Sequence, residues 1–411
     1  MSEILFLSHR IPFPPDRGDK IRSHHILRRL ARIAPVHVAT FADDDADAEA
    51  EGDLAHIASS HCLVRRTKPL PLAALEALAG SRPVSLTAFR SGAIESYVRQ
   101  TLARRPIGLI YVFSGQMGQY VPTSYPSRVV ADFVDVDSAK FEAYAVRDGG
   151  LRGWMEAREA RLMRDEELRL ARRAGVSLLI SDEEAQLFRS RLPLAERARI
   201  AVRTLANGID SATFAPYLTV PEPRMAQMPA PRLVFTGQMD YTPNVEACLR
   251  AVRSILPGIR ARFPQASFHI VGRNPPERLT SLSGRDGVHV WGRVPDVRPY
   301  LAAADLALIP LDIGRGVQNK VLEAMAMALP VVLTPEAATG IGARDGRELL
   351  LGHGDAELVE ACCALVEDRA RAKAMGEAAR RFVVSQASWE AALAELPEIV
   401  GFSGGTARDA A

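Results

Sequence analysis

Short apolar runs alternate with helix-like segments along almost the whole chain of 411 residues. Each run is bounded by glycine, proline or charged residues, and Ile4–Ser8 is the first of them. Runs of this length, apolar throughout, are typical of strands that are buried on both faces of a parallel sheet, because the crossover helices cover both faces. The alternation therefore predicts an α/β protein.

The alternation comes in two series, and this division predicts two domains. The first series runs from Ile4–Ser8 to Arg199–Thr204, and the second from Leu233–Met239 to Glu348–Gly352. The proline-rich segment Val220–Pro231 lies between them and is predicted to be the linker. A chain of this length can give each of two domains a full hydrophobic core.

Composition narrows the functional class. The formal net charge of +2 argues against a protein that binds nucleic acid through its overall charge. The apolar content of 47% and the charged content of 24% are those of a soluble globular protein. The four cysteines lack metal-ligand spacing and are predicted to be reduced. We see neither a signal peptide nor an apolar run of membrane-spanning length, so we expect a cytoplasmic protein.

The segment Asp312–Thr334 has the pattern of a phosphate-binding turn followed by a helix. Its loop contains Gly314 and Gly316, and Lys320 stands in the first turn of the predicted helix. Unpaired backbone N–H groups and the positive end of the helix dipole suit a phosphate at such a position. Glu323, one turn further, can accept hydrogen bonds from sugar hydroxyls. An ordinary loop and buried helix of an α/β domain is the alternative interpretation.

The end of the first predicted strand also leads through a loop into a helix. Prolines between Pro12 and Pro15 forbid helix there and stiffen the loop. Gly18 precedes the helix, and Arg17, Asp19 and Lys20 crowd the junction. A rigid lip of a binding site is one interpretation. A solvated start of a basic helix is the other.

Polar residues at other strand ends are further site candidates, since ligands of open α/β sheets bind at the carboxyl ends of the strands. Ser114, Asp135 and Asp137 stand at such positions in the first series, although one of the aspartates could simply cap the next helix. In the second series the strands end in residues that let a ligand approach the backbone, namely Gly237, Gly272, Gly292 and Pro310.

Each of two charged segments has a purely structural and a functional interpretation. The acidic segment 42–53 reads as a solvated loop and helix start rather than a metal-binding motif, because no hydrophobic strand flanks it. The helix predicted for Leu151–Ala174 carries many arginines and an apolar face of Trp154, Met155, Leu162, Met163, Leu168 and Leu170. Contact with an anionic membrane surface is one alternative for it, and a solvated helix with i,i+4 ion pairs is the other.

Several segments in order resemble the retaining glycosyltransferase family 4, also called group 1, of the GT-B fold. NGID at Asn207–Asp210 is similar to the interdomain signature of that family, and LVFTG at Leu233–Gly237 to the first strand of its C-terminal domain. GVQNKVLEAMAMALPVV, at 316–332, resembles its donor-site helix and strand. Trp389 is similar to the aromatic at its final kink. The openings around Gly18 and Asp135 most resemble a bacterial subgroup of sugar transferases associated with exosortase and exopolysaccharide loci.

The resemblance implies two facing Rossmann-like domains with a cleft between them. Residues 1–215 would form an N-terminal acceptor-side domain, which the C-terminal helix 388–402 would cross back to join. Residues 216–387 would form the C-terminal domain that binds a nucleotide-sugar donor.

The resemblance also implies roles for single residues. Glu323 matches the second glutamate of the EX7E pattern and would bind the donor ribose, while Arg315 replaces the first glutamate. Gln238 and Met239 stand where the family has an arginine and a lysine, so Lys320 is inferred to supply the positive charge for the diphosphate. Asp135 and Asp137 occupy the turn in which the family has a histidine, and they become candidate catalytic residues beside Lys320.

The complete prediction is sugar transfer from a nucleotide-diphospho-sugar to a lipid-linked or polysaccharide acceptor, with retention of configuration and without a metal or other cofactor. The donor would lie against Gly18, Gly237, Gln238, Gly272, Arg273, Arg293, Val294, Arg315, Gly316, Val317, Gln318, Asn319, Lys320 and Glu323. The acceptor would lie near Arg17, Asp19, Lys20 and Ser114. A sugar-nucleotide epimerase of the same fold and a non-catalytic sugar-nucleotide-binding partner are the alternatives.

Overall fold

The computed structural model describes residues 2–313 and 317–402, which include two compact units. The first unit holds the residues up to Asn207 together with those from Leu393 onward, and the second holds Gly208–Ala392. Each unit contains one parallel sheet, so the predicted α/β class is confirmed. The acceptor and donor roles expected of the two parts stay predictions.

The first unit is built on a parallel sheet with the strand order β3-β2-β1-β4-β5-β6-β7. The apolar run predicted as the first strand is fully buried in the middle of this sheet, which is why it carries no alternating pattern. The strands are β1 (Glu3–Ser8), β2 (Val36–Ala42), β3 (Ser60–Arg65), β4 (Ile107–Phe113), β5 (Arg128–Val134), β6 (Val176–Leu179) and β7 (Val202–Thr204).

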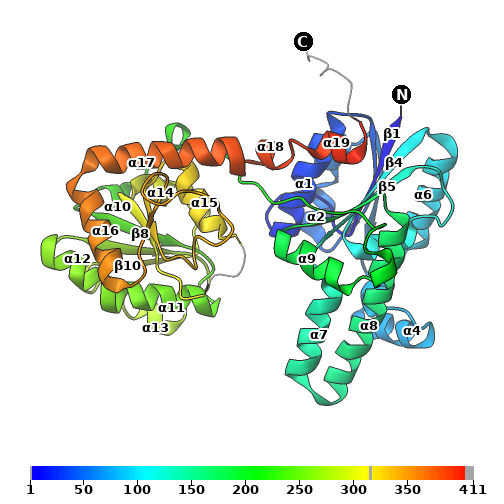
Figure 1. The fold of residues 1–411 in the computed structure, drawn as a ribbon, viewed down its shortest axis with the longest axis horizontal. Coiled ribbons are helices and arrows are strands. Elements are labelled where there is room, and N and C mark those ends of the chain that lie inside the picture. Colours follow the sequence, from blue (N-terminus) through cyan, green and yellow to red (C-terminus); the bar gives the residue numbers. More distant parts are fainter. Residues whose placement is uncertain (1, 314–316, 403–411) are drawn as a thin grey trace, which may run out of the picture. The chain divides into compact units, whose positions relative to one another are not determined.

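Helices surround this sheet, and α7 and α8 form a hairpin that projects from it with α4 beside α8 (Figure 1). The helices are α1 (Gly18–Ala31), α2 (Asp45–Glu49), α3 (Glu51–Ile57), α4 (Leu70–Ala79), α5 (Val84–Ala88), α6 (Gly92–Arg104), α7 (Asp137–Asp148), α8 (Gly150–Arg173), α9 (Asp182–Arg191) and α19 (Leu396–Val400). Two 3₁₀ helices accompany them, η1 (Gly115–Tyr120) and η2 (Leu194–Glu196).

The second unit has a parallel sheet with the strand order β10-β9-β8-β11-β12-β13. Its strands are β8 (Arg232–Thr236), β9 (Ser267–Val271), β10 (Val288–Gly292), β11 (Leu306–Ile309), β12 (Val331–Leu333) and β13 (Leu350–Leu351). Its helices are η3 (Pro216–Leu218), α10 (Pro223–Ala226), α11 (Thr242–Arg250), η4 (Ala251–Ile255), α12 (Leu256–Arg262), α13 (Glu277–Thr280), α14 (Arg298–Ala303), α15 (Asn319–Ala326), α16 (Asp355–Glu367), α17 (Arg369–Phe382), η5 (Val383–Ala387) and α18 (Trp389–Ala392).

The linker prediction for Val220–Pro231 is wrong. The chain passes between the units at Asn207 and Gly208, and the proline-rich segment packs onto the second unit. Met225 within it is fully buried, and the N–H of Glu222 donates a hydrogen bond to the carbonyl of Pro299 at 2.8 Å. Prolines limit backbone hydrogen bonding in such a segment, but burial of one large apolar side chain still fixes it to the core.

The C-terminal helices are more divided than the sequence predicts. The helix expected over 355–387 is interrupted at Asp368, whose carboxylate accepts a hydrogen bond from the N–H of Arg371 and so caps a new helix. The helix expected over 389–400 is two short helices, and Pro397 stands at the start of the second. Proline is tolerated at that position because its missing N–H would have had no helical partner.

The junction at Gly208 explains the NGID motif. A Cβ on Gly208 would lie 2.3 Å from the backbone nitrogen of Trp389, so only glycine fits against the last helical turn. The neighbouring Ile209 donates its N–H to the carbonyl of Ala387 at 2.8 Å and accepts from the N–H of Trp389 at 3.2 Å. The motif therefore fastens the end of η5 and the start of α18 to residues 208–209.

Candidate functional site

Most of the described donor-side candidates of the second unit lie at the carboxyl edge of its sheet. The chain leaves β8 toward β9 on one side, while β11 lies on the other side of β8. Such a reversal of strand order opens a crevice at the carboxyl ends, where ligands of α/β sheets bind. The loops that follow β8 and β9 form one wall of this region, and the start of α15 lies beside them.

Gly272 is required by the close approach of these two loops. The N–H of Gly237 donates to the carbonyl of Val271 at 3.0 Å, and a Cβ on Gly272 would lie only 1.6 Å from the oxygen of Gly237. No side chain can occupy that space without moving the β8 loop. Gly237 itself has a φ of +156°, which L-residues rarely adopt. The two glycines therefore keep this edge as bare backbone.

Lys320, in the first turn of α15, reaches this glycine edge. Its ammonium group donates to Oδ1 of Asn244 at 2.7 Å and to Oε1 of Gln318 at 3.3 Å. It also lies over the ring of Phe235, 5.2 Å from the centroid. Burial lowers the pKa of Lys320 to about 8, because a partly desolvated ammonium loses hydration. Both bonded partners are neutral amides, so the positive charge stays available to an anion.

Asn244 was not predicted from the sequence, and it organises the site. It is 4% exposed, and its Nδ2 donates to the carbonyl of Gln238 at 2.9 Å while its Oδ1 accepts from Lys320. One side chain thus ties the loop after β8 to the lysine of α15. The sequence shows only an asparagine near the start of a helix, which is equally typical of a cap, so no local signal identifies this bridge.

Glu323 lies one turn beyond Lys320 and is half-buried. Burial raises the pKa of Glu323 to about 7, while the charge of Lys320 opposes the rise. Among the described residues its carboxyl group has no hydrogen-bond partner. A carboxyl group that is partly desolvated and unpaired in this way is suited to accept hydrogen bonds from hydroxyl groups of a ligand.

The other predicted donor-side residues lie at the ends of β8, β9 and β10 or before α15. Arg273 donates to Oε1 of Gln238 at 2.8 Å, and the N–H of Gly272 donates to the carbonyl of Gly292 at 2.9 Å, so these three strand ends are joined. Arg293 and Val294 follow β10 directly. Val317 and Gln318 precede the first helical residue, Asn319. Gly314, Arg315 and Gly316 lie outside the described residues.

The first unit brings three of its predicted residues into one chain of polar contacts. Ser114 donates to Oε1 of Gln116, and Nε2 of Gln116 donates to Asp137 at 3.2 Å. Lys140 then pairs with Asp137 at 3.1 Å and with Asp135 at 3.6 Å. The sequence did not assign Gln116 or Lys140 to the site. Both belong to elements that follow predicted strands, but their orientation depends on how β4 and β5 pair.

The predicted acceptor-side lysine is buried. Lys20 is 2% exposed, and its ammonium group pairs with Asp47 and donates to the carbonyl of Phe13 at 3.3 Å. The interpretation of the acidic segment 42–53 as wholly solvated is wrong at Asp47, which is 1% exposed. A buried ion pair of this kind holds α1 to α2. This placement gives no support to an acceptor contact by Lys20.

The neighbouring residues are half-exposed and paired. Arg10 bonds Asp19 at 2.6 Å, and His9 lies 3.3 Å from the same carboxylate. Burial raises the pKa of Asp19, but the hydrogen bonds from His9 and Arg10 outweigh burial and hold that pKa well below its usual range. Arg17 is the more accessible cation, with ion pairs longer than 3.4 Å to three aspartates. Arg17 is therefore better placed than the buried Lys20 to contact a ligand.

Neither the space around residue 18 nor its backbone conformation requires a glycine. A Cβ at this position would meet no described atom within 4 Å, and its φ is not in the left-handed region. The glycine therefore leaves an open backbone surface at the first turn of α1, next to Arg17.

A buried network of polar side chains in the first unit was not predicted from the sequence. Arg22 and Asp132 are each 1% exposed and form a bidentate pair, in which Nε donates to Oδ2 at 3.2 Å and Nη2 donates to Oδ1 at 3.1 Å. Tyr111 donates to Asp132 at 2.9 Å, and Arg22 also donates to the carbonyl of Leu205 at 2.8 Å and to Oδ1 of Asn207 at 2.9 Å. The network fixes the last residues before the chain enters the second unit.

Among the described residues, no cluster of three or more His, Cys, Asp or Glu side chains has a geometry suited to a metal ion. No helix in residues 2–313 or 317–402 is long and apolar enough to cross a membrane.

Comparison with known proteins defines the class of the fold. Over 97% of the chain, the structure is similar to Anabaena HepE in complex with UDP and glucose, with a TM-score of 0.59, 15% sequence identity and 99% of that chain covered. It is similar over the same share to sucrose-phosphate synthase from Thermosynechococcus elongatus, with a TM-score of 0.58, 16% identity and 98% coverage. WaaG, a glycosyltransferase involved in lipopolysaccharide biosynthesis, gives a TM-score of 0.56 at 17% identity and 100% coverage. The predicted GT-B fold of two Rossmann-like units is confirmed.

A family profile described as "Glycosyl transferases group 1" matches residues 230–368, which lie within the second unit. A comparison with curated protein sequences gives no match. The matched range contains the glycine edge and Lys320. Together with the GT-B fold, this match identifies the chain as a glycosyltransferase.

Proposed function

We propose that the protein transfers a sugar from a nucleoside-diphosphate sugar to a glycan or lipid-linked acceptor, with retention of configuration and without a metal ion. The observation that carries this proposal is the placement of Lys320, whose ammonium group is held by Asn244 beside the bare backbone of Gly237 and Gly272. A diphosphate needs that combination of accessible backbone and fixed positive charge.

The roles of the donor-side residues follow from chemistry. Lys320 and the N–H groups at the start of α15 stabilise the charge that develops on the leaving diphosphate, and these donors are already oriented before the reaction. Glu323 accepts hydrogen bonds from the ribose hydroxyls. The base lies against the loops after β9 and β10, at Arg273 and Arg293. Gly18 leaves open backbone at the first turn of α1, and a donor contact by this residue stays a prediction from the sequence resemblance.

The acceptor-side roles are assigned to the contact chain of the first unit. Asp137 and Asp135 share Lys140, which holds both carboxylates near the carboxyl end of β5. We infer that they orient an acceptor hydroxyl, with Ser114 and Arg17 as further polar contacts. Retention, the membership of family 4 and the exosortase-associated subgroup are proposed from the sequence resemblance. A cytoplasmic enzyme of exopolysaccharide or cell-envelope glycan assembly fits that resemblance.

The similar structures guide the choice of the first ligands. HepE is described in complexes with UDP and glucose and with UDP-glucose, and WaaG is described as an enzyme of lipopolysaccharide biosynthesis. UDP-glucose is therefore the first donor to test, within a panel of nucleotide sugars followed by thermal shift and calorimetry. Binding to the folded state alone raises the apparent stability by mass action.

The decisive comparison is Lys320→Ala against Lys373→Ala, a lysine at the other end of the second unit. We expect the first variant to lose about tenfold to a hundredfold in donor affinity, because a charge-assisted bond to phosphate is removed. The second variant should bind the donor as the wild type does. Equal donor affinities in all three proteins would refute the site. Transfer that stops with a chelator and returns with a divalent ion would refute the metal-free mechanism.

We further infer a peripheral contact with anionic membrane through the tip of the α7–α8 hairpin (Figure 1). Val146, Leu151 and Trp154 are 88%, 76% and 57% exposed there, beside Arg147 and Arg152, which both form ion pairs with the single carboxylate of Asp148. The apolar face predicted for α8 is thus divided, since Trp154 and Met155 are exposed whereas Met163 and Leu170 are buried. Apolar and aromatic residues with flanking arginines suit the headgroup region of a bilayer.

Sedimentation with vesicles tests this contact. The double variant Leu151→Ser/Trp154→Ser should lose binding to vesicles of phosphatidylcholine with phosphatidylglycerol. The control Leu194→Ser removes an equally exposed apolar residue, 81% exposed in η2, and should bind as the wild type does. Equal sedimentation of the double variant and the wild type would contradict the inference.

A further inference from the structure

A pocket lies at the amino edge of the second sheet, away from the glycine edge and Lys320. Its volume is about 440 Å³, a size typical of sites for small molecules. Residues at or just before the starts of β8, β11 and β12 line it, among them Pro231, Leu306 and Pro330. Because all these strands are parallel, their amino ends lie on the edge opposite the one with the nucleotide site proposed above. Neither the proposed function nor the family match assigns a role to this pocket.

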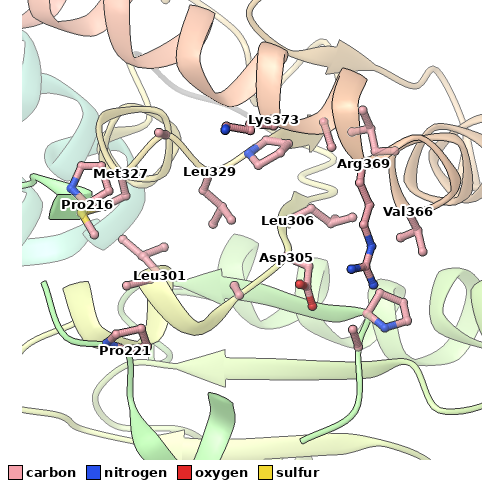
Figure 2. Close-up of a pocket in the computed structure, with 18 of the residues that line it drawn as sticks. Pro216, Pro221, Leu301, Asp305, Leu306, Met327, Leu329, Val366, Arg369 and Lys373 are labelled. Carbon is pink, nitrogen blue, oxygen red and sulfur yellow. The ribbon is translucent and has the colours of Figure 1, made fainter. Parts of the chain in front are cut away.

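The composition of the lining keeps the pocket open. Proline and alanine supply much of the wall, and their short or rigid side chains cannot fold inward to fill the space. Leucines supply the apolar surface, and Figure 2 shows Leu301, Leu306 and Leu329 around the interior.

Two cations on one helix border this apolar interior. Arg369 and Lys373 stand one turn apart on α17 and are both exposed, and neither forms an ion pair with another described residue. Figure 2 shows Arg369 extending toward Asp305. The carboxylate of Asp305 is already bound by the guanidinium of Arg232, at 2.9 Å and 3.0 Å. The pocket therefore has an apolar body and an uncompensated positive rim.

The pocket is connected to Lys320 through α15. Lys320 stands in the first turn of this eight-residue helix, and the residues directly after its last turn, Met327 and Ala328, line the pocket. The wall helix α17 is fastened to that same end. A Cβ on Gly376 would lie 2.0 Å from the oxygen of Ala328, and Arg380 donates a hydrogen bond to the carbonyl of Ala326. A molecule that fills the pocket must contact α17 and the residues directly after α15.

We propose that this pocket is an effector site for a small amphiphilic anion, a molecule with a short apolar chain and one phosphate or carboxylate group. The apolar chain is buried against the leucines, and the anionic group is bound by Arg369 and Lys373. Its occupancy changes the position of α15 and so the affinity of the opposite edge for nucleotide. This coupling rests on the proposed function, whereas binding to the pocket does not.

Calorimetry with octyl phosphate on the full-length protein tests the binding. We expect Lys373→Ala and Arg369→Ala each to weaken binding about tenfold, because each removes a charged partner of the phosphate. The matched control is Arg371→Ala, which removes an exposed arginine of α17 that does not line the pocket. Octanol and inorganic phosphate should each bind far more weakly than octyl phosphate. Added salt should weaken the binding of octyl phosphate but not that of octanol.

Two outcomes would overturn the site. One is the absence of octyl phosphate binding. The other is binding that is equally strong in Lys373→Ala and Arg371→Ala, which would show nonspecific adsorption of the alkyl chain. Ala372→Trp, which places an indole in the pocket, should abolish binding. The charge reversal Lys373→Glu provides a second readout, since an exposed position tolerates it without loss of fold.

The coupling is measured separately, as the affinity for UDP-glucose with and without saturating octyl phosphate. A change of about fivefold or more is expected in the wild type and not in Ala372→Trp, within the range of ordinary allosteric coupling. An unchanged affinity would refute the effector role. If UDP-glucose does not bind at all, the donor tested in the proposed function fails, while the octyl phosphate titration still decides the pocket.

Discussion

The partial burial of Lys320 predicts a conflict between stability and binding that can be measured. Its pKa falls from 10.5 to about 8, so holding the charged form in the folded state costs about 3 kcal/mol at neutral pH. Lys320→Met removes this cost and keeps the apolar stem. It also removes the bond to Asn244, which contributes about 1 kcal/mol. We therefore expect the variant to be more stable than the wild type by about 2 kcal/mol at neutral pH, and to bind nucleotide poorly.

The difference in stability between the wild type and Lys320→Met should depend on pH in a definite direction. Below about pH 8 the lysine is protonated in both folded and unfolded states, and the full cost is present. Between about pH 8 and 10.5 the folded protein loses the proton before the unfolded chain does, so the stability of the wild type rises relative to the variant. Nucleotide affinity of the wild type should fall over the same range, since the cation is lost.

Urea unfolding of both proteins at several pH values is the assay. The difference between their unfolding free energies cancels other groups that titrate in this range. Lys373→Met serves as the control, because that lysine is exposed and should show no such difference. A variant that is less stable than the wild type by the same amount at every pH would refute the reasoning, since Lys320 would then act as a structural hydrogen-bond donor.

Three further outcomes follow from the geometry. Gly272→Ala should lower both stability and nucleotide affinity, by more than about 1 kcal/mol in unfolding free energy, while Gly18→Ala should leave the melting temperature unchanged. Asp132→Ala should destabilise the protein by about 3–5 kcal/mol in urea unfolding, because Arg22 would stay buried without its partner. Lys140→Ala should lower the transfer rate without changing donor affinity, measured by calorimetry beside steady-state kinetics; a loss of donor affinity would contradict its place on the acceptor side.

The local pattern of the sequence was sufficient to locate nearly every strand of both sheets. An apolar run between glycine and proline residues can be satisfied only by burial, and this condition does not depend on the neighbours of the strand. The glycines at the strand ends could also be predicted from local sequence. Gly272 stands where two backbones meet, and no other residue fits there.

Charged residues were the main source of error. Lys20 was predicted to contact the acceptor or to lie at a solvated helix start, and Asp47 to be a solvated charge, yet each is the buried partner of the other. Arg22, Asp132 and Tyr111 form a second such set. Their burial depends on residues far away in the chain that happen to be complementary, and no local pattern records such a pairing.

The sequence by itself determined the two α/β units, and it predicted Lys320 and Glu323 as site residues. Only the tertiary structure decided what holds Lys320, since Asn244 lies 76 positions away in the chain. It also decided that α15 links the glycine edge to a cationic pocket on the opposite edge of the sheet. Periodicity and turn chemistry are local properties, whereas a hydrogen bond or a cavity exists only when distant segments pack together.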